Sequence, residues 1–249
     1  MSTSPIDAVI DQLDQIIDLQ HQLGHRQGYF PALYRRVTIE VKNGVNNGVF
    51  EDPARMERFD VLFANRYVEA FENRSRGEPT TRAWTVAFDA TENWWPIVLQ
   101  HLLLGINAHI NLDLGIAAAL TSPGSAIDGL EKDFARINGI LADLVDDVQR
   151  QLEQIWPSLV WLGRIAGRTD EAIINFSMEK ARRQAWAVAK RLAPLDEAAR
   201  QSVIDQLDLK TALIGHAIRR PGPLARCVLA YIRLRERGTV REIIDILRR

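Results

Sequence analysis

The residues best suited to chemistry lie in one short segment, residues 105–114, inside the most apolar stretch of the chain. On an α-helix, residues four apart differ by about 40° in azimuth, so His109 and Asp113 share one face. Asn107 and Asn111 form a second polar pair on nearly the opposite face. A helix that is apolar at most positions is usually buried on all sides, and buried polar groups must find partners. The segment therefore predicts specific polar contacts on two sides of one buried helix.

A histidine and an aspartate one helical turn apart are suited to holding a metal ion. His109 offers a neutral nitrogen and Asp113 a charged oxygen, a combination that zinc, iron and manganese accept. Two ligands are too few, and the candidates for the others are Glu40, Asp60, Glu69 and His101. Asp60 and Glu40 are preferred because each stands among apolar neighbours. We therefore expect the metal ligands to be His109, Asp113, Asp60 and Glu40.

A buried structural network is the alternative reading of the same residues. In that case Asp113 or a backbone carbonyl holds His109 in one tautomer, and Asn107 and Asn111 bridge neighbouring helices. In the metal-site reading, by contrast, Gly105, one turn before His109, would leave room for a ligand above the ring. The spacing alone does not separate a site from a structural network.

Several function classes are excluded by missing motifs and by charge. The chain has no phosphate-binding loop, no dinucleotide fingerprint, no nucleophile elbow and no Glu-x-x-His pair, so no nucleotide cofactor is expected. The single cysteine, Cys227, forms neither an intramolecular disulfide nor a cysteine-based metal site. With 31 Lys and Arg against 32 Asp and Glu, the chain has no overall field that would attract nucleic acid or an anionic membrane.

The ends and the apolar runs of the chain predict a cytoplasmic protein. The first residues have neither a basic stretch nor an apolar core, so they do not form a secretory signal. The longest apolar runs, residues 102–106 and 114–120, are separated by polar residues and fall short of the ~20 residues that a membrane span needs.

Helical periodicity runs through almost the whole chain. Apolar residues from Ile6 to Leu23 recur at the i, i+3, i+4 and i+7 spacing of an amphipathic helix, and Gly24 is its expected C-cap. Asp52 and Pro53 suit the N-cap and first position of another helix. Residues 37–41 are the best local strand candidate but fit a helix better. The expected helices cover about residues 6–23, 30–42, 53–76, 80–89, 96–120, 127–155, 169–186, 196–216, 224–235 and 239–247.

These elements predict an all-α fold, a single-domain multi-helix bundle around a buried central helix at residues 96–120. Residues 1–195 are the expected bundle core that carries the polar site. Residues 196–249 are the expected C-terminal helical extension, packed on the same domain. No linker rich in proline, glycine or serine separates the two parts.

Several strings together resemble a family of bacterial proteins defined only as a domain of unknown function. They are Tyr34-x-x-Val37-Thr38, Phe50-x-Asp52-Pro53, Asp60-Val61-x-Phe63-Ala64-Asn65-Arg66-Tyr67, Gly105-x-Asn107-Ala108-His109-Ile110-Asn111-x-Asp113-Leu114 and Arg182-x-x-Ala185-Trp186. The resemblance covers about residues 25–195. It implies a helical protein of the kind frequent in actinobacteria, without an activity to transfer. It adds weight to a working set of His109, Asn107, Asn111, Asp113, Asp60, Asn65 and Arg66.

Together these observations favour a metal-dependent helical enzyme, a hydrolase or an oxygen-activating enzyme, acting on a small, partly apolar substrate. The expected cofactor is a divalent zinc, iron or manganese ion. The expected catalytic residues are Asp60, Asn107 and Arg66. The residues expected to contact the substrate are Asn65, Asn111 and Tyr34.

The alternative function is a metal-free helical binding protein for a small apolar ligand. Tryptophan side chains would line its cavity, and the His, Asp and Asn network would orient the ligand. A third reading is an interaction module with no ligand. The expected partner is a small molecule rather than nucleic acid or membrane, and the sequence leaves a homo-oligomer open. The six tryptophans are Trp84, Trp94, Trp95, Trp156, Trp161 and Trp186.

Overall fold

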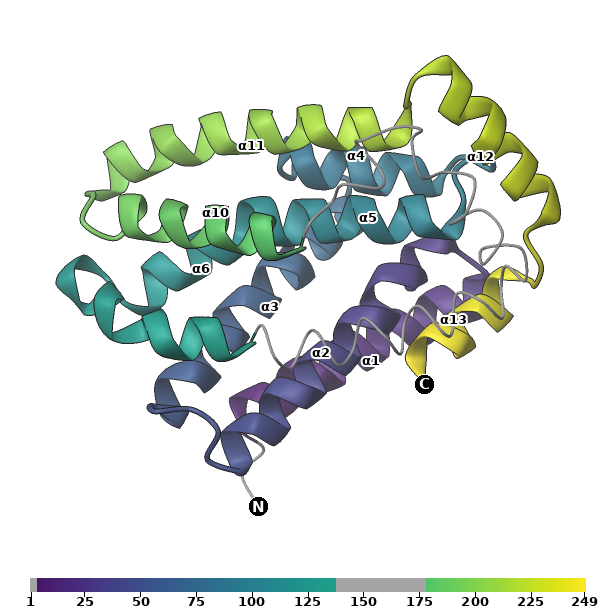
Figure 1. Cartoon of the computed structure of the whole chain (residues 1–249). Coiled ribbons are helices and arrows are strands. Elements are labelled where there is room, and N and C mark those ends of the chain that lie inside the picture. Colours follow the sequence, from purple (N-terminus) through teal and green to yellow (C-terminus); the bar gives the residue numbers. More distant parts are fainter. Residues whose placement is uncertain (1–3, 138–177) are drawn as a thin grey trace.

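The structure, a computed structural model, describes residues 4–137 and 178–249 (Figure 1). Most of these residues are helical and no strand occurs among them, so the all-α prediction is confirmed. The elements are α1 (Pro5–Leu23), η1 (Arg26–Gly28), α2 (Tyr29–Asn46), α3 (Pro53–Arg76), α4 (Arg82–Thr91), α5 (Val98–Ala108), η2 (His109–Asp113), α6 (Leu114–Thr121), η3 (Gly124–Leu130), α10 (Met178–Leu192), α11 (Glu197–Arg219), α12 (Pro223–Arg235) and α13 (Val240–Arg248).

Local capping signals set several helix boundaries. Gly24 closes α1 with a φ of 63°, a left-handed conformation that glycine adopts without strain. The side chain of Asp52 accepts a hydrogen bond from the Arg55 amide at 2.9 Å and starts α3, with Pro53 at the first helical position. Thr239 starts α13 in the same manner. These ends lie where the sequence predicts them.

Two expected helices differ in extent. α2 continues to Asn46, beyond the predicted end near Lys42. Gly44 is buried in its last turns, so packing holds this turn in spite of its weak helix propensity. The helix expected over residues 127–155 begins with the 3₁₀ turns of η3, and residues 131–137 are helical. The rest of that helix, and residues 169–177 of the next, lie outside the described residues.

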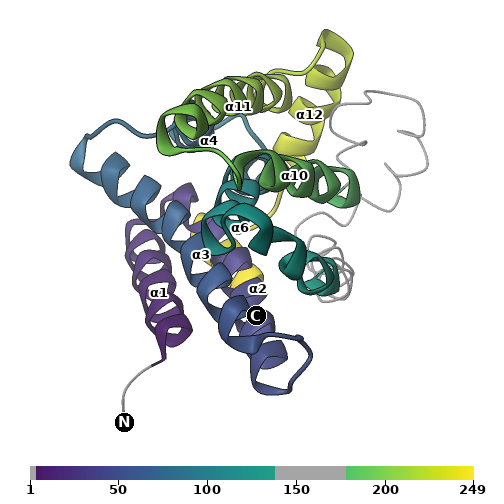
Figure 2. The same cartoon turned by 90° about the vertical axis from the view of Figure 1, so that its left-hand side faces the viewer.

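α5, η2 and α6 form one continuous helical rod from Val98 to Thr121, close to the predicted central helix. Figures 1 and 2 show the rod between α4 and α11 on one side and α1, α2 and α3 on the other, with α10 packed along α6. Within the described residues, this rod alone is long and apolar enough to cross a membrane, but 89% of the tested window is buried inside the fold. Its apolar residues form the core of the bundle.

The packing of α10 against α6 depends on a glycine. A Cβ atom placed on Gly115 would lie 2.7 Å from the carbonyl oxygen of Ala185. Real Cβ atoms do not approach a backbone oxygen so closely, so only glycine lets these two helices meet at this distance.

The C-terminal helices pack on the bundle in two places. α11 lies against α4 and α5, and α13 lies against α1 and α2. Ile243, Ile244 and Leu247 of α13 join a buried apolar cluster with Ile17 and Leu33. The division of the chain at residue 195 stays a prediction.

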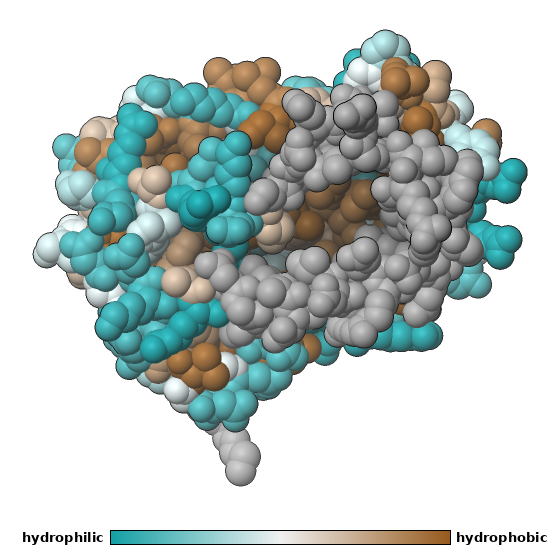
Figure 3. Space-filling view, in the orientation of Figure 1, coloured by the Kyte–Doolittle hydropathy of each residue, from teal (hydrophilic) through white to brown (hydrophobic). Residues whose placement is uncertain are grey.

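The outer faces of α11 and α12 carry exposed apolar side chains. They are Leu209, Leu213, Ile214, Leu224, Tyr231 and Leu234. Figure 3 shows apolar residues along the upper edge of the molecule, where these two helices lie in Figure 1, while hydrophilic residues cover much of the left side. A second copy of the chain would bury such side chains, and the homo-oligomer stays untested.

Candidate functional site

The predicted polar segment lies where the central rod changes from α-helix to one turn of π-helix. Within η2, the Leu114 amide donates to the carbonyl of His109, five residues earlier. His109 and Asp113 still lie side by side, with His109 Nδ1 3.5 Å from Asp113 Oδ2, at the outer limit of a hydrogen bond. Single π-turns inside α-helices are frequent at functional sites. The four-residue spacing predicted the contact between His109 and Asp113, but it did not predict the π-turn.

Asp113 is the centre of a buried polar cluster. Its Oδ1 accepts a hydrogen bond from Arg66 Nε at 2.7 Å, and its Oδ2 accepts one from Trp84 Nε1 at 2.8 Å. Burial favours the neutral acid, but the contacts with His109 and Arg66 outweigh burial and keep the pKa of Asp113 below its ordinary value. Asp113 is therefore an ionised carboxylate whose two oxygens are both engaged by protein donors.

His109 is packed between aromatic rings. Its ring stacks on Phe63 with 3.6 Å between centroids, and the ring of Tyr34 meets it edge-on at 4.3 Å. Burial lowers the pKa of His109 against the opposing pull of Asp113, so the ring is neutral at pH 7. A neutral ring that directs its Nδ1–H toward Asp113 leaves Nε2 as an acceptor, and Nε2 is buried without a hydrogen-bond partner in the described structure.

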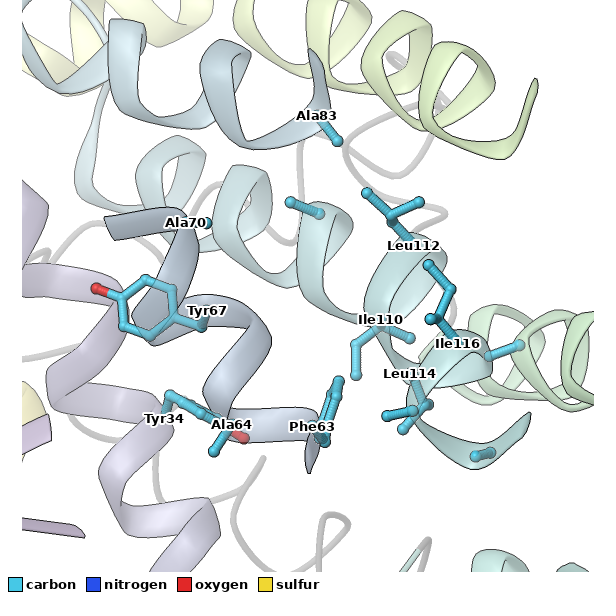
Figure 4. Close-up of a cluster of buried hydrophobic side chains, with 14 of the residues drawn as sticks. Tyr34, Phe63, Ala64, Tyr67, Ala70, Ala83, Ile110, Leu112, Leu114 and Ile116 are labelled. Atoms are coloured by element: carbon cyan, nitrogen blue, oxygen red, sulfur yellow. The ribbon is translucent and has the colours of Figure 1, made fainter. Parts of the chain in front are cut away.

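Asp60 and Tyr34 extend the same cluster. Both are buried, and Asp60 Oδ2 and Tyr34 Oη have no hydrogen-bond partner among the described groups. Burial raises the pKa of Asp60 to about 8, so this acid is mostly protonated at pH 7. Burial, and then the neighbouring carboxyl of Asp60, raise the pKa of Tyr34 well above its usual range. Figure 4 shows Tyr34 and Phe63 among the buried side chains that α2 and α3 present toward the rod.

The two asparagines tie the rod to α11. Asn107 Nδ2 donates to the carbonyl of Thr211 at 2.9 Å, and Asn111 Nδ2 donates to Asn107 Oδ1 at 2.9 Å. The predicted second polar face therefore exists, and its contacts join helices. The catalytic role of Asn107 and the substrate role of Asn111 stay predictions.

Glu40 and Asn65 do not join the buried cluster. Both side chains are exposed, because the buried face of α2 carries Tyr34 and Val41 while that of α3 carries Phe63. Apolar neighbours in sequence suggested a buried Glu40, but helical periodicity turns it to solvent. Within residues 4–137 and 178–249, no three His, Cys, Asp or Glu side chains are grouped to hold a metal ion.

A small cavity of about 20 Å³ adjoins this cluster. Phe30 links the two, since its ring contacts His109 and also forms part of the cavity wall. Tyr67 and His101 line this cavity, and Tyr67 Oη and both ring nitrogens of His101 are buried without a hydrogen-bond partner in the described structure. A water-sized group needs roughly 10–15 Å³, so the cavity admits a small polar head group. Its lining residues are Arg26, Gln27, Phe30, Tyr67, Trp84, Ala87, Phe88, Thr91, His101 and Gly105.

The mouth of the cavity is formed by η1. Arg26 and Gln27 are half-buried, whereas the other lining residues are buried. Arg26 Nη1 donates to the carbonyl of Thr91 at 3.4 Å, a long hydrogen bond that joins η1 to α4.

The position of Gly105 corrects one expectation. The space above His109 is filled by Phe30, since a Cβ on Gly105 would lie 2.4 Å from that ring. The absence of a side chain on Gly105 therefore makes room for the Phe30 ring, and Gly105 also lines the neighbouring cavity.

The sequence analysis included Trp84 among the tryptophans that would line a cavity and His101 among the candidates for further metal ligands, but it missed Tyr67 and Arg26 as cavity residues. One signal was available, because Asp60, Phe63 and Tyr67 follow the i, i+3, i+7 spacing of one helix face. The other tryptophans lie elsewhere or outside the described residues: Trp94 and Trp95 are exposed, Trp186 packs on Phe134, and Trp156 and Trp161 are not described.

A comparison with protein families matches residues 6–221 to a family of unknown function, DUF5995. The match contains the polar cluster, the cavity and all of α11, and it extends beyond the resemblance at residues 25–195 in both directions. Neither the curated proteins nor the solved structures give a match. Since the family model covers most of the chain, this protein belongs to DUF5995, a family of unknown function.

Proposed function

We propose that this protein binds a small amphipathic molecule in the cavity between η1, α2, α3, α4 and α5. The polar head of the ligand bonds to Tyr67 and His101 inside the cavity, and its apolar part extends through the mouth past Arg26 and Gln27. The observation that carries the proposal is a cavity lined by Tyr67 and His101, two residues whose polar side-chain atoms are buried without a hydrogen-bond partner in the described structure.

The energetics of buried polar groups support this assignment. A buried donor or acceptor left without a partner costs about 1–3 kcal/mol, and folded proteins leave few of them. A ligand head that bonds to Tyr67 and His101 removes this cost. An apolar cleft with a few convergent polar groups is the usual form of a small-molecule site.

The polar cluster around Asp113 has a defined part in this function. Asp113 accepts the indole N–H of Trp84, and Arg66 holds the other carboxylate oxygen. Trp84 is also part of the cavity wall. The cluster therefore fixes one aromatic wall of the site, and Arg66 and Asp113 act as positioning residues.

Two tyrosines provide the test. Tyr67 and Tyr34 both carry a buried hydroxyl without a partner in the described structure, but only Tyr67 lines the cavity. Binding of 1-hexanol is followed by NMR at the Trp84 indole N–H, a signal assigned by its loss in Trp84→Phe. We expect saturable binding, about three- to tenfold weaker in Tyr67→Phe because one hydrogen bond to the ligand is lost.

The control is Tyr34→Phe, which removes an equally unpartnered hydroxyl outside the cavity. Its affinity for hexanol should equal that of the wild type. Equal affinity in all three proteins, or no saturable shift of the Trp84 signal, contradicts the proposed site.

A metal-dependent enzyme, hydrolase or oxygen-activating, is the second candidate function. It is favoured by two buried atoms without a partner in the described structure, His109 Nε2 and Asp60 Oδ2. Both residues lie near Tyr34, because the His109 ring contacts the Tyr34 ring and, besides burial, the Asp60 carboxyl raises the pKa of Tyr34. Elemental mass spectrometry of the wild type and His109→Ala tests it. Stoichiometric zinc, iron or manganese that is lost in the variant supports the enzyme, and metal content that is absent or unchanged contradicts it.

A further inference from the structure

We infer that the head group held in this cavity is a carboxylate, paired with Arg26 at the cavity mouth. The inference rests on the proposed binding function and narrows the chemical class of its ligand. It follows from the composition of the cavity wall, from the position of Arg26 and from the charges behind His101.

The wall of the cavity offers hydrogen-bond donors and no acid. No Asp or Glu is among its ten lining residues, and its ionisable side chains are Arg26, Tyr67 and His101. The hydroxyl of Thr91 is already used, since it donates to the carbonyl of Phe88 at 2.6 Å. The free polar atoms therefore include a tyrosine O–H and an imidazole N–H, both of which donate to a carboxylate oxygen.

Arg26 is the one permanent cation of the wall, and it stands at the entrance. Its guanidinium has five N–H donors, of which one makes the long bond to the Thr91 carbonyl. No described carboxylate forms an ion pair with Arg26, whereas the neighbouring His25 faces Glu92 at 3.6 Å. A planar carboxylate matches the guanidinium fork in two parallel bonds, which makes Arg26 a suitable partner for an incoming acid.

The charges near His101 also favour a carboxylate in the cavity. Burial lowers the pKa of His101 to about 3, the positive charges of Arg26 and Arg233 add to this effect, and the backbone of Pro96 opposes it. The same positive field that opposes protonation of His101 stabilises an anion beside it. Glu236 forms an ion pair with Arg233 and also accepts from the amide of Val98, so it largely cancels the charge of Arg233 and leaves Arg26 as the cation beside the cavity.

Arg26 also belongs to an element that can respond to a ligand. η1 is a three-residue turn between α1 and α2, and the side chain of His25 caps it by accepting from the Gln27 amide at 3.3 Å. Exchanging the long Thr91 contact for a charge-assisted bond to a carboxylate strengthens the hydrogen bonding of the guanidinium. Arg26 therefore recognises the head group from the mouth of the cavity.

Three ligands that share one alkyl chain test the inference: hexanoate, 1-hexanol and hexylamine, titrated at pH 7.5 and followed at the Trp84 indole N–H. We expect hexanoate to bind at least tenfold more tightly than hexanol, and hexylamine to bind more weakly than both. Arg26→Met should remove the preference for hexanoate and leave hexanol binding in place, whereas Arg26→Lys should retain part of it. Arg58→Met, which removes an exposed arginine of α3, is the matched control and should keep the full preference.

The outcomes separate this inference from the proposed function. Hexanol binding as tightly as hexanoate, or a preference for hexanoate that survives in Arg26→Met, overturns the carboxylate and leaves the binding site in place. Failure of all three ligands to shift the Trp84 signal overturns the binding function itself.

Discussion

At the scale of single residues, the bond between Trp84 and Asp113 connects the buried cluster to the cavity wall. Trp84→Phe leaves one oxygen of a buried carboxylate with only the long His109 contact. We expect this variant to lower the free energy of unfolding by about 2 kcal/mol more than Trp186→Phe. Trp186 is the control because its buried Nε1 has no partner in the described structure.

A double-mutant cycle separates the contribution of this hydrogen bond to the free energy of unfolding from the effect of the smaller ring in Trp84→Phe. Chemical unfolding of Trp84→Phe, Asp113→Asn and the double variant should give an interaction energy between the two sites of at least about 0.5 kcal/mol. Strictly additive effects would show that Trp84 acts by packing alone.

Asp60 gives the protein a pH-dependent stability. Its pKa is about 8 in the folded protein against an ordinary value of 3.8 for aspartate, so the folded state holds one more proton between these limits. The contribution of Asp60 is therefore fully present below about pH 4 and is lost as the pH rises through 8, with a slope of up to about 1.4 kcal/mol per pH unit. Asp60→Asn should remove this slope in urea unfolding measured from pH 4.5 to 8.

Asp11→Asn, on the exposed face of α1, is the matched control and should keep the wild-type slope. Parallel stability profiles of the wild type and Asp60→Asn would mean that Asp60 is ionised in the folded protein.

The sequence predicted part of this residue-level arrangement. The contact between His109 and Asp113 follows from a four-residue spacing on one helix. The partners that complete the cluster, Arg66 and Trp84, lie 47 and 29 residues before Asp113 in other helices. Their approach depends on how α3 and α4 pack on the rod, and no local spacing encodes that packing.

At the scale of elements, helix existence and capping were predictable because periodicity and caps are local. The π-turn η2 was not, since an apolar segment with partners on all sides has no periodicity that separates α from π geometry. The C-terminal end of α2 was also not predictable from local sequence. Burial of Gly44 stabilises the last turns of this helix, although its residues there favour turns.

The close contact of α6 and α10 makes an element-scale prediction. Alanine for glycine inside a helix ordinarily stabilises it by about 1 kcal/mol. Gly115→Ala should instead destabilise the protein by about 1–3 kcal/mol, because its Cβ meets the Ala185 carbonyl at 2.7 Å and the backbone must move. Denaturant unfolding measures the change.

Gly215→Ala on α11 is the control. Its Cβ would meet Val86 Cγ1 at 3.1 Å, a side-chain tip that gives way more easily than a backbone oxygen. A loss of stability in Gly215→Ala as large as that in Gly115→Ala would contradict the assignment of close helix packing to Gly115.

At the scale of the whole molecule, the cavity is a product of the tertiary fold. Its wall combines η1, α2, α3, α4 and α5, whose residues span Arg26 to Gly105. Local sequence patterns identify the aromatic residues, but they do not show that Tyr67 and His101 line the same cavity. The fold class was therefore within reach of the sequence, whereas the site needed the three-dimensional structure.

A crystal structure of the protein grown with 6-bromo-1-hexanol tests the binding function most directly, because the anomalous signal of bromine locates the ligand. We expect its hydroxyl within hydrogen-bond distance of Tyr67 Oη or His101, and its chain directed toward Arg26 and Gln27. A ligand found only at the protein surface, or a cavity closed by direct bonds between Tyr67 and His101, would contradict the proposed function.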